Sequence, residues 1–172
     1  MTSFYDSLGE TERARLASPL RDRIAITTHE EWRLFWQARL QLVLYGTDRG
    51  IGEFEALTSA TDAEVRAAAF MMLGELHQDT GRLEEALRMY EAAARSVASA
   101  HATYRIAACH VRLGDAAEGE RLLRAALLAG EGASDCDWMR SAVRDYLALA
   151  RKSSEGPDPA VIDHVHRVCR TA

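Results

Sequence analysis

Residues 70–94 read FMMLGELHQDTGRLEEALRMYEAAA, and this stretch decides the fold. It holds two helix-forming segments separated by a break at Gly81, and it places Gly74 inside the first of them. Glycine in a helix interior costs about 1 kcal/mol relative to alanine, so its presence indicates a packing reason. Two antiparallel helices approach closely only where side chains are small, and Ala86 in the second segment is the predicted partner of Gly74.

The rest of the chain shows further helix-forming segments and no strand-like alternation of useful length. Helices are expected at about 30–46, 50–58, 62–79, 82–97, 100–112, 115–129, 134–152 and 158–170. Residues 1–27 are expected to hold one or two short helices, interrupted at Ser18-Pro19. Capping-box spacings begin at Thr28, Thr61 and Asp115, and Ser134 is the expected cap of the long helix after residue 134. The sequence therefore predicts an all-α protein of about eight helices.

A repeat emerges when the two glycine stops, Gly81 and Gly114, are aligned at their spacing of 33 residues. The frame then matches Gly74 with Ala107 and Ala86 with Gly119. Small residues recur at one place in each helix, so the second helix pair should repeat the close contact of the first. Such a period predicts an array in which each unit buries its apolar face on its neighbours.

The motif Phe70-x-x-Leu73-Gly74-x-x-His77, followed by Ala86-x-x-x-Tyr90-x-x-Ala93, resembles the tetratricopeptide repeat (TPR), with His77 where tyrosine is usual. The run TDAEVRAAAFMMLGEL also resembles a HEAT repeat, but the following GRLEEALRMYEAAA favours the TPR. The resemblance implies a right-handed α-solenoid of antiparallel helix pairs. Its repeats are expected at 32–65, 67–100, 100–133 and 136–171, the last as a degenerate cap. Residues 28–172 would form one repeat domain behind an N-terminal helical segment, residues 1–27.

The resemblance also implies a concave groove, lined by the first helix of each unit, that binds a peptide or helix of a partner protein. The groove residues in this frame are Arg33, Trp36, Met71, Glu75, Gln78, His101, Tyr104, Arg112, Arg140 and Arg144. Methionine and aromatic side chains rimmed by arginine suit such a role. The alternative is that Met71 and Trp36 lie in the core, because a frame error of one residue would turn them inward.

Three aromatic residues, Trp32, Phe35 and Trp36, lie on one side of their predicted helix, next to arginines. Terminal repeats must be sealed, so these rings are expected to cover one end of the solenoid. The alternative is a homodimer contact, since large aromatics with arginine are typical of interface centres.

Composition narrows the classes of function. The formal net charge of −5 and the pI of about 5.7 argue against a general nucleic-acid binder. No apolar run is long enough to span a membrane, and the first residues do not resemble a secretory signal. The three cysteines, Cys109, Cys136 and Cys169, are odd in number and widely spaced, so reduced thiols of a cytoplasmic protein are expected.

No catalytic or cofactor-binding constellation stands out. His164 and His166 point in different directions on a helix, and the pair His166 and Cys169 offers too few ligands for zinc. The sequence therefore predicts a non-catalytic interaction module without metal or cofactor, acting as an adaptor, scaffold or chaperone. An accessory subunit working through homodimerisation is the alternative. The segment YRIAACHVRLGDAAEGERLL also loosely resembles the TPR chaperones of bacterial type III secretion, which hold hydrophobic segments.

Overall fold

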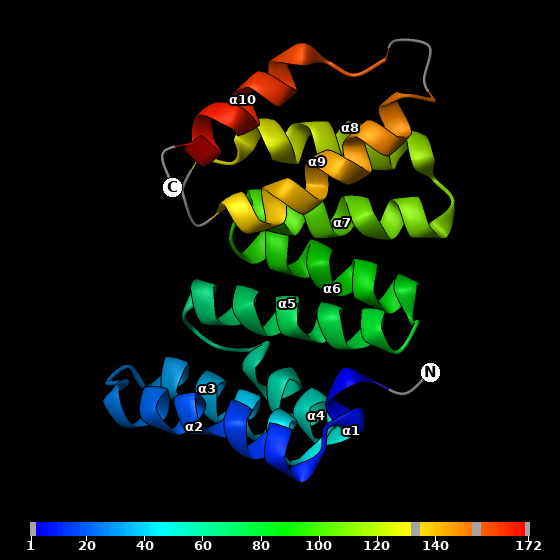
Figure 1. The fold of residues 1–172 in the computed structure, drawn as a ribbon. Helices are drawn as coiled ribbons and strands as arrows, with labels where there is room; N and C mark the ends of the chain where they lie inside the picture. The colour runs from blue at the N-terminus through cyan, green and yellow to red at the C-terminus, as the bar shows by residue number, and fades with distance from the viewer. Residues whose placement is uncertain (1–2, 132–134, 153–155, 171–172) are drawn as a thin grey trace. The chain divides into compact units, whose positions relative to one another are not determined.

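The computed structural model describes residues 3–131, 135–152 and 156–170 (Figure 1). The chain divides into two compact units, Met1–Val97 and Ala98–Ala172. The first unit holds α1 (Phe4–Ser7), α2 (Glu10–Ile26), α3 (Glu30–Tyr45), α4 (Thr47–Leu57), α5 (Ala63–Asp79) and α6 (Leu83–Ser96). The second holds α7 (Ala100–Leu113), α8 (Ala116–Ala129), α9 (Cys136–Ala150) and α10 (Pro159–Arg170). The all-α prediction is confirmed: the described residues form ten helices and no strand.

Consecutive helices pack as pairs within each unit (Figure 1). In the first unit α3 packs on α4 and α5 on α6, while α2 lies along α3 and α4 contacts α5. In the second unit α7 packs on α8, and α10 contacts both α8 and α9. The first core is built around Leu42, Phe54, Leu73 and Leu76, and the second around Leu123, Met139, Tyr146 and Val161.

Gly74 marks a close approach of α5 and α6, as its place in the helix predicted. A Cβ atom at this position would lie 2.6 Å from Cδ1 and 2.9 Å from Cζ of Tyr90. The nearest neighbour is thus the buried Tyr90 ring, which occupies the space that Gly74 leaves. The equivalent contact in the next pair joins Gly119 to α7, where a Cβ would lie 3.3 Å from the Ala107 carbonyl oxygen.

We expect Gly74→Ala to lower the free energy of unfolding by about 1–3 kcal/mol, because the added methyl group overpacks against the Tyr90 ring. Gly52→Ala is the matched control, since Gly52 is exposed in α4 and a Cβ there would meet nothing within 4 Å. Helix propensity should make this control more stable by up to about 1 kcal/mol. Urea unfolding followed by circular dichroism measures both, and a Gly74→Ala protein as stable as the parent would contradict the close approach.

Both glycine stops behave as the repeat predicted. Gly81 has φ of 80° and Gly114 has φ of 95°, a region that residues with a Cβ rarely adopt. The Gly114 N–H donates to the carbonyl oxygens of α7, and Asp115 caps α8 by accepting from the Glu118 N–H at 3.2 Å. The two stops therefore end equivalent helices 33 residues apart.

The interruption expected at Ser18-Pro19 is wrong, because α2 runs through Pro19 without a break. Proline removes one helical hydrogen bond, but its φ is compatible with a helix. Packing of α2 along α3 outweighs that loss, and Ala17 of α2 is fully buried. The helix expected at 50–58 also begins earlier, at Thr47.

Two of the predicted caps are wrong by one residue. His29 rather than Thr28 caps α3, and Asp62 rather than Thr61 caps α5. The reason lies in Glu31, whose carboxylate accepts from both the N–H and the hydroxyl of Thr61 at 2.9 Å and from the Asp62 N–H at 2.8 Å. Thr61 thus holds the start of α5 beside α3 instead of capping its own helix. The expected cap Ser134 lies outside the described residues.

A single residue, Gly46, joins α3 to α4. Its φ of 90° ends α3, where its N–H donates to the Leu42 carbonyl at 2.9 Å, and its carbonyl accepts from Gly50 at the start of α4 at 3.1 Å. Asp6 completes the joint by accepting from the Thr47 N–H at 2.8 Å. The N-terminal turn α1 is therefore part of the first unit's packing.

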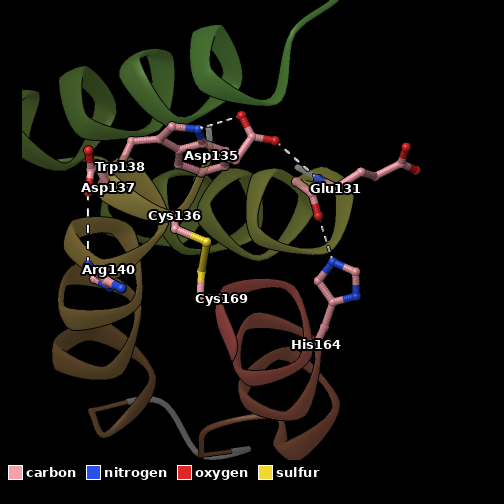
Figure 2. Close-up of a disulfide and its surroundings, with 9 residues drawn as sticks. Glu131, Asp135, Cys136, Asp137, Trp138, Arg140, His164 and Cys169 are labelled. Carbon is pink, nitrogen blue, oxygen red and sulfur yellow. Dashed lines mark hydrogen bonds and ion pairs between the residues drawn. A yellow bond between two sulfur atoms is a disulfide. The ribbon is translucent and has the colours of Figure 1, made fainter. Parts of the chain in front are cut away.

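The prediction of three reduced thiols is wrong for two cysteines. Cys136 at the start of α9 and Cys169 in the last turn of α10 form a disulfide with a Cα–Cα distance of 5.4 Å (Figure 2). The two residues meet because α10 folds back onto α9, which their separation in the sequence does not reveal. Cys109 is a buried free cysteine, as the core interpretation predicted.

Candidate functional site

Three aromatic rings stack on one another in the second unit. His101 and Tyr104 come from α7 and Trp138 from the first turn of α9. The ring centroids lie 6.2 Å apart for His101 and Tyr104, 5.9 Å for His101 and Trp138, and 5.6 Å for Tyr104 and Trp138. All three residues are partly exposed, so this ring stack both joins α7 to α9 and offers a surface.

Hydrogen bonds hold the ring stack in place. Nε of Arg105 donates to Nε2 of His101 at 3.3 Å, and the Arg105 guanidinium lies 5.9 Å from the Tyr104 ring centroid. The Trp138 indole N–H donates to the Asp135 carboxylate at 3.1 Å (Figure 2). Rings fixed in this way lose little conformational entropy when a partner packs on them.

Burial is the largest cause of the pKa shifts of His101 and Tyr104 in the ring stack. Burial, with a smaller contribution from the Arg105 charge, lowers the pKa of His101, so the imidazole is neutral at pH 7. Burial, together with the charge of Asp145, raises the pKa of Tyr104, while Arg105 and Arg144 act in the opposite direction. The Tyr104 phenol therefore remains a neutral donor beside two cationic side chains.

We expect acid to destabilise the second unit through His101. The folded state binds the His101 proton less readily than the unfolded state, whose pKa is about 6.5. The stabilisation is present above that value and is lost as the pH falls below it towards the lowered folded pKa. His101→Phe keeps a ring in the stack and cannot titrate, so its unfolding midpoint should fall less between pH 7.5 and pH 5. Equal falls for variant and parent in urea titrations would contradict this.

A second aromatic surface lies in the first unit, on α2 and α3. Trp32 stacks on Trp36 at a centroid distance of 6.2 Å, and the guanidinium groups of Arg23 and Arg39 lie 4.7 and 5.5 Å from the Trp36 ring centroid. Phe35, expected at this surface, is only 5% exposed and packs on Phe54 in the core.

A surface hollow of about 400 Å³ lies beside these tryptophans. It is lined by Arg23, Ile26, Thr27, Thr28, His29, Trp32 and Trp36. Ile26 is 78% exposed at the end of α2, which is unusual for a large aliphatic side chain. Trp32, Trp36 and Ile26 thus form an amphipathic surface, which we call the tryptophan surface.

The other groove residues predicted in the first unit lie on α3 and α5. Arg33 pairs with Glu30 on the exposed side of α3, and Met71 is partly exposed on α5. Gln78 accepts a hydrogen bond from the Tyr90 hydroxyl at 3.4 Å. Glu75 lies close enough to Tyr5 of α1 for its charge to raise the Tyr5 pKa, after the larger effect of burial.

The groove residues predicted in the second unit face different surroundings. Arg112 lines a hollow of about 440 Å³ among α7, α8 and α9, whereas Arg140 lines an apolar groove between α9 and α10. Against the larger effect of burial, which raises the pKa of Tyr104, the charge of Arg144 lowers it. The sequence analysis did not place Trp138 in the groove, because α9 meets α7 only through tertiary packing; an aromatic residue near the start of this helix was the available signal.

Metal ligands do not gather in the part of the chain that the structure describes, where no group of three His, Cys, Asp or Glu side chains could hold an ion. Cys169 is in the disulfide, and a His164 ring nitrogen lies 2.8 Å from the Gly130 carbonyl oxygen. None of the helices formed by the described residues is long and apolar enough to cross a bilayer.

Comparison with known proteins indicates a TPR-like fold. No protein-family model and no curated protein sequence matches the chain. Among solved structures, the chain is similar to a crystal structure of a thermophilic TPR protein from Thermus thermophilus. The TM-score is 0.52 with 19% sequence identity, over 93% of this chain and 90% of that one. At this identity the likeness shows the fold alone.

Proposed function

We propose that this chain, whose fold is TPR-like, is a non-catalytic interaction module that binds a peptide of a partner protein on the ring stack of His101, Tyr104 and Trp138. A TPR-like fold is a scaffold for protein interaction in general, and its stacked helices display side chains at regular intervals. The observation that carries the proposal is a stack of three partly exposed rings, two of which are also held by hydrogen bonds.

The surroundings of the stack favour a particular peptide. An aromatic or aliphatic side chain of the partner would pack on the rings, since aromatic residues supply much contact area at low entropic cost. Against burial and the charge of Asp145, which raise the pKa of Tyr104, the charges of Arg105 and Arg144 both lower it. These two cationic side chains would attract a carboxylate of the partner next to the anchor. The expected ligand is an extended segment with an apolar anchor next to an acidic residue.

Peptide selection by phage display, followed by fluorescence anisotropy with the selected peptides, tests this proposal. Tyr104→Ala and Trp138→Ala should each weaken binding by about tenfold or more. Leu128→Ala is the control, because Leu128 is 41% exposed on α8, away from the stack. Circular dichroism confirms that each variant is folded. Peptides that bind the two ring variants as tightly as the parent would reject the ring stack as the site.

The tryptophan surface supports a second candidate, homodimerisation through α2 and α3. Exposed Ile26 beside Trp36 and its two arginines has the composition of an interface centre. Sedimentation equilibrium of the parent, of Ile26→Asp and of Ile26→Val distinguishes the outcomes. A parent dimer that dissociates only in the aspartate variant supports this candidate, and a parent monomer removes it.

A chaperone of the type III secretion kind is a special case of peptide binding. Such a protein would select hydrophobic segments without the acidic neighbour expected above. The same peptide selection separates the two, because Arg144→Glu should weaken acidic peptides and leave purely apolar ones unaffected.

The cytoplasmic location expected from the sequence remains a prediction, and the disulfide argues against it. Disulfides persist mainly in oxidising compartments and are rare in the cytosol. Trapping of thiols with a maleimide in intact cells of the native host measures the state of Cys136 and Cys169. A cytoplasmic protein should be labelled at both, whereas a protein in an oxidising compartment should be labelled at neither.

A further inference from the structure

An apolar groove runs between the last two helices of the second unit. It has a volume of about 360 Å³, and its apolar wall is formed by Val143 and Leu147 of α9 and by Ile162, Val165 and Cys169 of α10. No described residue of another helix lines it. We call it the α9–α10 groove.

Helix geometry places this groove on the side of α9 that faces away from α7. Val143 and Leu147 are four residues apart and therefore share a face of the helix. Trp138 and Leu149, which contact α7 or line the hollow beside it, lie roughly 160–180° around the helix from Leu147, at about 100° per residue. The groove thus lies where a further helix of a repeat array would pack.

The charged side chains among the described residues that line the groove are cationic. Among the described residues, its lining includes Arg140 and Arg170, with His166 beside them, and no carboxylate. The acidic side chain that pairs with Arg140 is Asp137, which is fully exposed and lies 3.9 Å away, so its screening is weak (Figure 2). This basic rim contrasts with the net charge of −5 of the whole chain.

We propose that the α9–α10 groove binds an acidic amphipathic helix of a partner protein. The apolar wall spans about two helical turns, from Ile162 to Cys169, and suits the i, i+3, i+4 and i+7 side chains of such a helix. Carboxylates flanking this apolar face would pair with Arg140 and Arg170. A second copy of the chain fits less well, because a two-fold contact would bring the same arginines together.

Two contacts fix the groove before any partner arrives. The disulfide from Cys169 to Cys136 holds the last turn of α10 beside the first turn of α9 (Figure 2). A ring nitrogen of His164 in α10 lies 2.8 Å from the Gly130 carbonyl oxygen, so this contact holds α10 beside the end of α8. A preformed groove reduces the ordering that a partner must cause, which favours binding.

The test uses two synthetic, fluorescein-labelled helices of about 18 residues, which is five turns. One carries leucine on one face and glutamate elsewhere, and its twin carries lysine in place of each glutamate. Fluorescence anisotropy with the full chain should show binding of the acidic helix and at least tenfold weaker binding of the basic twin. A benzophenone version of the acidic helix should crosslink to residues 140–147 and 162–170.

Charge reversal provides the matched variants. Arg140→Glu with Arg170→Glu should weaken the acidic helix by about tenfold or more, whereas Arg167→Glu, an exposed site of α10 outside the lining, should change the affinity less than threefold. Tyr104→Ala should leave this affinity unchanged, which separates the α9–α10 groove from the ring stack.

Three results would overturn the proposal. They are equal binding of the basic twin, unchanged affinity of the double variant, and crosslinks to α7 instead of α9 and α10. A fourth result concerns a lipid-like occupant: a chain that binds laurate, a single-chain carboxylate, and does not bind the acidic helix would also overturn it.

Discussion

Tyr90→Ala should lower the free energy of unfolding by about 3–5 kcal/mol, the usual cost of truncating a buried aromatic residue. Tyr90 is 0% exposed, and its ring fills the space over Gly74 where α5 and α6 approach closely. Its hydroxyl also donates to Gln78 at 3.4 Å. Urea unfolding at several protein concentrations measures the change.

Tyr45→Ala is the control for this result. Tyr45 is 68% exposed at the end of α3, so its truncation should change the stability by no more than about 0.5 kcal/mol. Because domains are stable by only about 5–15 kcal/mol, the Tyr90 variant should lose roughly a fifth or more of the total. Similar losses of stability for the two variants would show that the Tyr90 ring over Gly74 does not stabilise the packing of α5 on α6.

Loss of the disulfide should cause the second large decrease in stability. The bond closes a loop of 33 residues, for which loop-closure entropy gives about 3–4 kcal/mol. Cys136→Ser with Cys169→Ser should therefore unfold at a lower temperature than the parent. Dithiothreitol should lower the parent to the same midpoint and leave the double variant unchanged. A parent that is indifferent to the reductant would contradict a stabilising bond.

Most of the fold could be predicted because the repeat depends on local features. Gly81 and Gly114 stop their helices through a backbone conformation that glycine adopts readily, and this preference is legible in the sequence. The break expected at Pro19 was wrong because packing on α3 decided it, and packing is not local.

The candidate site was harder to predict for the same reason. His101 and Tyr104 were expected at a surface and form two thirds of the ring stack, but Trp138 reaches them from α9, a different helix. The disulfide was missed because Cys136 and Cys169 become neighbours only after α10 folds back on α9. A sequence reveals which side chains share one helix, and not which helices share a surface.

The one-residue joint at Gly46 limits how this chain can change its length. One extra residue there would rotate α4 by about 100° about its axis and carry Phe54 away from Phe35. It would also separate Asp6 from the Thr47 N–H that it caps. Insertions and deletions should therefore be excluded from this position among natural variants, and epitope tags or circular permutation sites should fail there.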